Sequence, residues 1–425
     1  MNRSSGLYLA NILLIFLIGL ITFGAVIATL VYRRSSLISP LASIPFFSFL
    51  YLSGWVFFQE SIGKSVTVND FLLIIVGLLS VIFFSIGGLS VKKVHMTYQP
   101  LSLIRIKLTA LFLVSLGLSL FSIVYIKYGF VFFVSGKGVR NLIYQEMGFE
   151  KFAKDFLVVG VFLLNYYYLR VNKFLSILYL SLLLISILLL ISLEVRSALS
   201  IIMLSFIYFY DKYVTKIANY KILLLFLLLI SLGAIAKELF YALRQVVSSN
   251  HTNPQLYRAI YSVFINHEFY AWFEIFQNLK TEFVAGDTFL RGFLSVFQPS
   301  FMGGEGFSAT QWYANKYLPD IAKQGFGRGF SFIVELYINF TIIGMLLIMF
   351  LFGRGLAILE RSERFLIPSF CVSAFPFIWT GSSSILLKQY FLIYFIPAYL
   401  VYNTLTLVTS KRDKHSLPPE RAGQH

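Results

Sequence analysis

The sequence predicts an all-α protein that crosses a membrane many times. Of its 425 residues 58% are hydrophobic and only 13% are charged, and its mean hydropathy is +0.79, far above that of soluble globular domains. Apolar runs of about 20 residues, the length that crosses about 30 Å of hydrocarbon, recur along the chain. We therefore predict a polytopic integral membrane protein with about eleven transmembrane helices.

The position of each apolar run gives the expected order of the spans. The first run resembles a secretory signal, but it is too long for one and no small-residue cleavage site follows it, so we expect it to be retained. The runs at 154–170 and 197–211 are short, and an error in either would reverse the orientation of one end of the chain. The spans are expected near 7–32, 40–58, 70–91, 108–128, 154–170, 174–193, 197–211, 220–237, 330–353, 364–380 and 386–409.

The basic residues that give the chain its net charge of +16 lie in alternate loops. This distribution argues against a nucleic-acid partner and follows the positive-inside rule. It places the C-terminus in the cytoplasm and, with an odd number of spans, the N-terminus outside. The groups are Arg33 and Arg34; Lys92, Lys93, Arg105 and Lys107; Arg170 and Lys173; Lys212, Lys216 and Lys221; Arg354, Arg361 and Arg364; Lys411, Arg412 and Lys414.

The same alternation divides the chain into four parts. Residues 1–237 form the N-terminal transmembrane helices, and 238–329 form one large outer loop, the longest segment between predicted spans. Residues 330–409 form the C-terminal transmembrane helices, and 410–425 a polar cytoplasmic tail. Stretches of the loop such as 256–276 alternate apolar and polar residues at helical spacing, which predicts amphipathic helices at the membrane interface.

No residue pattern in the sequence indicates a metal or a cofactor. The single cysteine, Cys371, lies in an apolar run, and the five histidines are scattered without ligand spacing. HExxH, DxD, GxSxG and Walker motifs are absent from the sequence. We expect no metal site and no cofactor.

Four arginines of the large loop are candidates for binding a phosphate-containing ligand. The planar guanidinium forms bidentate, charge-assisted bonds with phosphate and keeps its charge at all relevant pH values. Taken alone, each arginine is better explained as a snorkelling or topology residue near a helix end. Together, however, they lie on the side where the positive-inside rule disfavours them. They are Arg244, Arg258, Arg291 and Arg328.

Arg196 and His267 are further candidates. Arg196 follows Glu194 in a turn too short to carry both into water, so it forms either a local ion pair or a contact with an anionic substrate in an outward-facing cavity. His267, next to Glu268, could act as an acid or a base, because histidine titrates near neutrality. The alternative for His267 is the polar face of an interfacial helix.

Glu335 is a carboxylate just inside the apolar run that follows the large loop. Ser331 is a plausible N-cap for this helix, and Glu335 and Asn339 are spaced i, i+4, so they share a face. Glu335 could merely complement the positive helix N-terminus, which is worth under about 1 kcal/mol. We favour an inward-facing polar stripe beside Arg328, with a functional role.

Three stretches resemble the Wzy-type O-antigen polymerases, the oligosaccharide repeat-unit polymerases of bacterial envelopes. EVRSALSIIMLSFIYFY (194–210) resembles the family's arginine-containing entry to a span in the middle of the chain. GDTFLRGFLSVFQPSF (286–301) resembles its loop segment ending in proline, and GRGFSFIVELYINFTIIG (327–344) its entry to the span after the loop. The overall arrangement of spans and loop is also similar over nearly the full chain.

The resemblance implies a GT-C-like, metal-independent glycosyltransferase of the bacterial inner membrane, with its large loop in the periplasm. Its substrates would be undecaprenyl-diphosphate-linked oligosaccharides, and a chain-length regulator protein is a further implied partner beside the bilayer. The arginines, Arg196 included, would hold the diphosphate, Asn339 would contact substrate, and Glu335, with His267 second, would serve as acid or base. An O-antigen ligase, a lipid-linked oligosaccharide flippase and a small-anion transporter are the alternatives.

Overall fold

A computed structural model describes the chain over most of its predicted spans and over part of the large loop. The described residues are 3–33, 35–61, 66–91, 102–129, 143, 147–173, 175–192, 196–228, 267–279, 282–297, 307, 309–323, 330–361 and 394–404. Within them the secondary structure is helical, without any strand. The predicted all-α class is thus confirmed for this part of the chain.

The helices follow the apolar runs of the sequence. They are α1 (Arg3–Arg33), α2 (Pro40–Ser61), α3 (Val68–Leu89), α4 (Leu103–Tyr128), the 3-10 helix η1 (Phe149–Phe152), α7 (Ala153–Arg170), α8 (Ile177–Ser192), α9 (Arg196–Tyr213), α12 (His267–Leu279), α13 (Asp287–Phe297), α14 (Ala309–Tyr317), α15 (Pro319–Lys323) and α16 (Phe332–Arg361).

Six helical segments within the described residues are long and apolar enough to cross a membrane: Ala10–Arg33, Pro40–Phe57, Val68–Leu89, Leu103–Tyr128, Phe149–Arg170 and Phe332–Glu360. The shorter apolar helices Ile177–Ile191 and Asn219–Leu228 coincide with two further predicted spans. The described residues thus support several spans, and the number eleven stays a prediction. The predicted span 364–380 lies outside the described residues, as do parts of 220–237 and 386–409.

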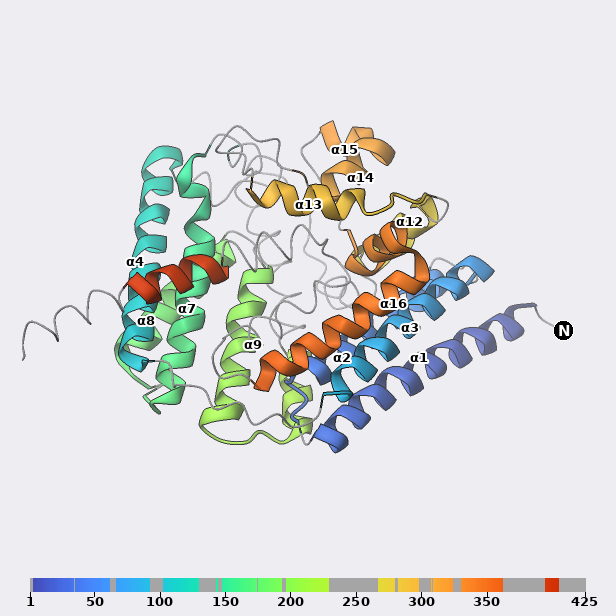
Figure 1. Ribbon diagram of the computed structural model, residues 1–425, viewed down its shortest axis with the longest axis horizontal. Helices are drawn as coiled ribbons and strands as arrows, with labels where there is room; N and C mark the ends of the chain where they lie inside the picture. Colours follow the sequence, from blue (N-terminus) through green and yellow to red (C-terminus); the bar gives the residue numbers. More distant parts are fainter. Residues whose placement is uncertain are drawn as a thin grey trace, which may run out of the picture.

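The long helices form two groups (Figure 1). One group contains α4, α7, α8 and α9, and the other contains α1, α2, α3 and α16. Helix α2 contributes to the apolar cores of both, because Phe46 and Phe47 pack on Phe226 while Trp55 belongs to the core with α3 and α16.

Glycines allow the closest helix crossing in each group. A Cβ added to Gly353 of α16 would lie 2.0 Å from the carbonyl oxygen of Phe84 in α3, and one added to Gly160 of α7 would lie 2.7 Å from the backbone nitrogen of Val114 in α4. Small residues at such crossings let helix backbones approach within van der Waals contact. These two crossings hold together the most extensive helix pairs in the described chain, α3 with α16 and α4 with α7.

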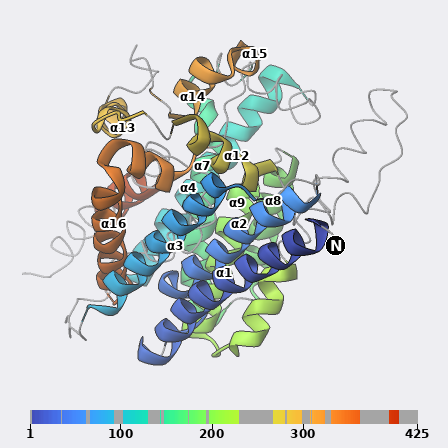
Figure 2. The same ribbon diagram turned by 90° about the vertical axis from the view of Figure 1, so that its right-hand side faces the viewer.

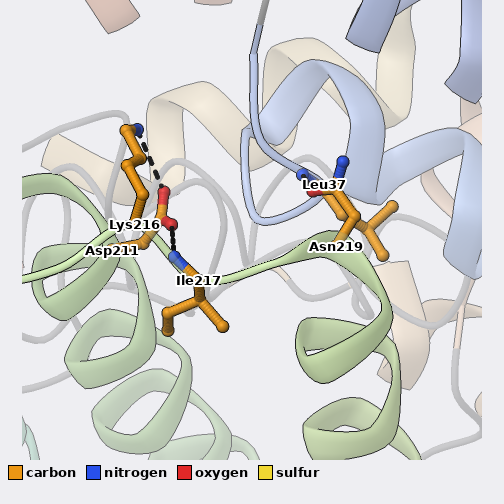
Figure 3. A network of polar contacts seen from close by, with 5 residues as sticks. All are labelled: Leu37, Asp211, Lys216, Ile217 and Asn219. Atoms are coloured by element: carbon orange, nitrogen blue, oxygen red, sulfur yellow. Dashed lines mark hydrogen bonds and ion pairs between the residues drawn. The ribbon is translucent and has the colours of Figure 1, made fainter.

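The described loop helices and the turn after α9 lie at opposite ends of the molecule. Helices α12 to α15 gather along the upper side in both views (Figure 1, Figure 2). The turn after α9 lies at the lower side, where the Asp211 carboxylate accepts hydrogen bonds from the Ile217 N–H at 2.7 Å and from Lys216 Nζ at 3.3 Å (Figure 3). Nearby, Asn219 Oδ1 accepts from the Leu37 N–H at 3.0 Å, which ties this turn to the turn between α1 and α2.

Candidate functional site at the entry of α16

Helix α16 carries a buried carboxylate in its first turn. Glu335 is 0% exposed, and Asn339, one turn later, is buried beside it. The inward-facing polar stripe that the i, i+4 spacing predicts is therefore present. Its neighbours along the helix, Val334 and Leu336, are also buried, so Glu335 lies in an environment with little water.

Ser331 occupies the position before the helix, but its hydroxyl does not cap the helix. Its backbone carbonyl accepts a hydrogen bond from the Glu335 N–H at 2.9 Å. The Ser331 Oγ is buried and, among the residues described, has no hydrogen-bond partner. The predicted side-chain cap is thus wrong. The Ser331 hydroxyl is a further buried polar group, one turn before Glu335.

The helix is broken directly after the polar stripe. Thr341 has φ of 60° and ψ of −175°, which is a strained conformation for a β-branched residue. The break frees the carbonyl of Ile338 from its partner within the helix, and this carbonyl accepts a hydrogen bond from the Val284 N–H at 2.9 Å. Residues 332–340 thus form a separate short helix that carries both Glu335 and Asn339.

The large loop reaches this short helix through Thr288, the second residue of α13. The Asn339 Nδ2 donates to Thr288 Oγ1 at 2.7 Å and to the backbone carbonyl of Glu335 at 2.6 Å. Thr288 is buried. Within the described part of the chain, the Asn339 Oδ1 is buried without a hydrogen-bond partner. A buried acceptor that no described residue engages is available to a hydroxyl or amide donor of a ligand.

The turn before α13 is shaped to make this contact. Ala285 and Gly286 both have positive φ, 47° and 86°. A Cβ on Gly286 would lie 3.8 Å from the Phe340 ring. The left-handed backbone suits glycine and lets the chain turn sharply between Val284, which binds the Ile338 carbonyl, and Thr288, which binds Asn339.

Helix α12 fixes the loop on α2 and α3. The Phe273 ring stacks on Trp55 of α2 at 4.3 Å, and the Phe276 ring packs on Tyr337 of α16 at 4.8 Å. The Gln277 Nε2 donates to the carboxylate of Asp70 at 2.9 Å. Asp70 also closes a capping box at the start of α3. The described loop helices are therefore docked on the ends of the spans.

Arg291 is the one predicted arginine whose side chain the structure describes. It lies on α13, three residues after Thr288, and is 58% exposed. Its Nε lies 2.9 Å from a carboxylate oxygen of Asp287 in an i, i+4 pair. Arg291 thus faces outward on the helix whose inner side contacts Asn339.

The other predicted site residues are described in part or not at all. Arg196 and His267 are the first residues of α9 and α12, and the structure describes only their backbone. Arg244, Arg258 and Arg328 lie outside the described residues. A cluster of arginines around Glu335 stays a prediction.

Thr288 and Asp155 are among the buried polar residues that the sequence analysis did not single out. The Gly286-Asp287 sequence before Thr288 indicates the start of a helix. It does not indicate that Thr288 contacts Asn339. Asp155, at the start of α7, is another buried carboxylate, and its Oδ1 accepts from the Tyr394 hydroxyl at 3.3 Å. Asp155 could have been found in the sequence by the criterion that indicated Glu335, namely a carboxylate in the first turn of an apolar run.

In the described part of the chain, histidine, cysteine and acidic side chains do not gather into a group of three or more that could hold a metal ion. The chemistry of the α16 entry depends on a carboxylate, an amide and two hydroxyls. A carboxylate shielded from water can accept a proton or orient a hydroxyl, and an amide can hold a polar ligand in a fixed direction.

Comparison with protein-family models finds no match, and neither do the comparisons with curated proteins and with solved structures.

Proposed function

We propose that this protein polymerises undecaprenyl-diphosphate-linked oligosaccharide repeat units into O-antigen or a related surface polysaccharide. The reaction would be a metal-independent, GT-C-like glycosyl transfer on the periplasmic face of the bacterial inner membrane, with the C-terminus in the cytoplasm. The resemblance in three sequence stretches suggests it. The buried polar stripe at the entry of α16 supplies the chemical groups that it needs.

Glu335 carries the most weight in this proposal. A carboxylate in a dry environment at the junction of loop and span is suited to orienting or deprotonating the hydroxyl of an acceptor sugar. Asn339 would hold the same sugar through its carbonyl oxygen, which no described residue engages. The predicted arginines would neutralise the diphosphate as it leaves.

Deletion of the gene, followed by analysis of the surface polysaccharide on a gel, tests this proposal. Loss of long chains with retention of single repeat units on lipid A is the result expected for a polymerase. Complete absence of glycan on the lipid A core would indicate a ligase or a flippase instead. An unchanged distribution of chain lengths would contradict all three functions.

A further inference from the structure

Helix α13 exposes three large apolar side chains, while a fourth, Phe289, packs against Phe332 and Phe340 of α16. Leu290, Phe293 and Leu294 are 57%, 48% and 52% exposed. Thr288 and Gly292 lie on the buried side. A helix of a soluble domain has the reverse arrangement. Exposing three such side chains to water is unfavourable, because burying apolar surface stabilises the folded chain.

The contacts of α13 set its depth relative to the span of α16. Its turn and first residues bind Ile338 and Asn339, which are six and seven residues after the start of α16. These contacts lie in the short helix 332–340, directly before the break at Thr341 and the long part of α16. Interfacial helices embed their apolar face to about 5–10 Å, and α13 lies at the end of the span where such a helix would be found.

The direction of α13 also fits a helix that lies in the membrane plane. It runs crosswise to α4 and α9 in Figure 1 and is seen nearly end-on in Figure 2, at the periphery next to α16. The outward-facing stripe of α16 begins immediately after the contact with α13, at Ile342 and Ile343, and continues with Leu347 and Leu351. The exposed apolar surface of α13 therefore adjoins the surface that a spanning α16 would present to lipid.

We propose that α13 is embedded in the outer leaflet of the bilayer, with Leu290, Phe293 and Leu294 among the acyl chains. Asp287 and Arg291, paired and about half exposed, would lie at the level of the headgroups. Because Thr288 on the opposite side binds Asn339, the leaflet would hold α13 in contact with the entry of α16. This inference concerns where α13 lies and holds independently of the reaction proposed above.

Spin-label accessibility in reconstituted vesicles tests this placement. We would replace Cys371 by serine, introduce cysteine by Leu290→Cys, Phe293→Cys or Leu294→Cys, and reconstitute each protein in vesicles of phosphatidylethanolamine and phosphatidylglycerol. Collision rates of the attached label with oxygen, which enters lipid, and with a water-soluble nickel complex are then compared. We expect oxygen collisions to exceed nickel collisions several-fold at all three positions.

Two positions of the same chain calibrate the measurement. Ile343→Cys, on the most exposed part of α16 at 77%, gives the value for lipid, and Asp320→Cys, 91% exposed on α15, gives the value for water. Nickel accessibility at 290, 293 and 294 equal to that at 320 would place α13 in water. Protection from both reagents would show that another protein surface covers this face. Either result would overturn the proposal.

Discussion

At the scale of single residues, the bond between Asn339 and Thr288 connects the large loop with α16. Thr288→Val keeps the shape of the side chain but leaves the Asn339 Nδ2 without its partner across the contact. Loss of a buried hydrogen bond in this way costs about 1–3 kcal/mol. We expect a lower Tm for the purified protein in a thermal-shift measurement.

Thr288→Ser is the matched control, because it retains the hydroxyl and should preserve most of the stability. A double-mutant cycle with Asn339→Leu separates the bond from the local effects of each change. If Thr288→Val and Asn339→Leu lower the Tm additively, the bond does not contribute to stability.

Glu335→Gln removes the negative charge and nearly preserves the volume of the side chain. We expect this variant to abolish chain extension without lowering the abundance of the protein in the membrane, because Gln cannot accept a proton from a sugar hydroxyl. Polysaccharide chain length on a gel and protein abundance on an immunoblot are the two measurements. Glu335→Asp is the control that keeps the carboxylate and shortens its reach.

Arg196→Ala is the corresponding test of an arginine in the predicted diphosphate site. We expect loss of chain extension at normal abundance, because an alanine cannot neutralise the leaving diphosphate. Arg196→Lys retains the charge and should keep part of the activity. Normal chain lengths in both Arg196→Ala and Glu335→Gln would disprove the site assignment.

The sequence indicates some of these residues and not others, for a physical reason. Glu335 and Asn339 are recognisable because a helical repeat brings them onto one face within a single element. Thr288 is not, because its contact with Asn339 joins positions 51 residues apart and depends on how the loop docks. The failure of Ser331 as a cap likewise depends on packing that buries its hydroxyl.

At the scale of the elements, the crossing of α3 and α16 depends on Gly353. A methyl group there would lie 2.0 Å from the Phe84 carbonyl oxygen, so the helices would have to separate. We expect Gly353→Ala to lower the Tm, with a cost of about 1–3 kcal/mol typical of overpacking.

Gly355→Ala, one half-turn further along the same helix, is the matched control. A Cβ at Gly355 meets nothing within 4 Å. Since alanine is the better helix former by about 1 kcal/mol, Gly355→Ala should leave stability unchanged or raise it. Equal effects of the two substitutions would show that the close crossing does not limit stability.

The helices themselves are well predicted, whereas the break in α16 is not. Apolar runs of sufficient length locate α1, α3, α4 and α16, because a spanning helix must satisfy its own backbone. Nothing in the sequence marks Thr341 as the breaking point, since neither proline nor glycine stands there. The break is explained by a contact with the loop, in which the Val284 N–H donates a hydrogen bond to the Ile338 carbonyl.

At the scale of the whole molecule, the predicted topology places the large loop outside and the turn before α8 in the cytoplasm. In a Cys371→Ser background, Asp320→Cys should react with a membrane-impermeant maleimide in intact spheroplasts. Lys173→Cys should react only after permeabilisation. Labelling in the opposite order would reverse the topology, and the proposed periplasmic reaction would then be untenable.

The sequence predicts the overall plan of the molecule better than its interior. The basic residues of alternate loops predict which ends of the helices share a side, and the structure sets the turn after α9 opposite the helices of the loop. The division into two helix groups that share α2 is not evident from the sequence, because it depends on tertiary packing such as that of Phe46 and Phe47 on Phe226.

The most direct test of the proposed function is reconstitution of the purified protein with its substrate. Vesicles would contain the wild-type protein and undecaprenyl-diphosphate-linked single repeat units, and the products would be separated by chain length. We predict a ladder with increments of one repeat unit for the wild type and single units alone for Glu335→Gln. If the wild type leaves the single units unextended while retaining its fold, the protein is not a repeat-unit polymerase.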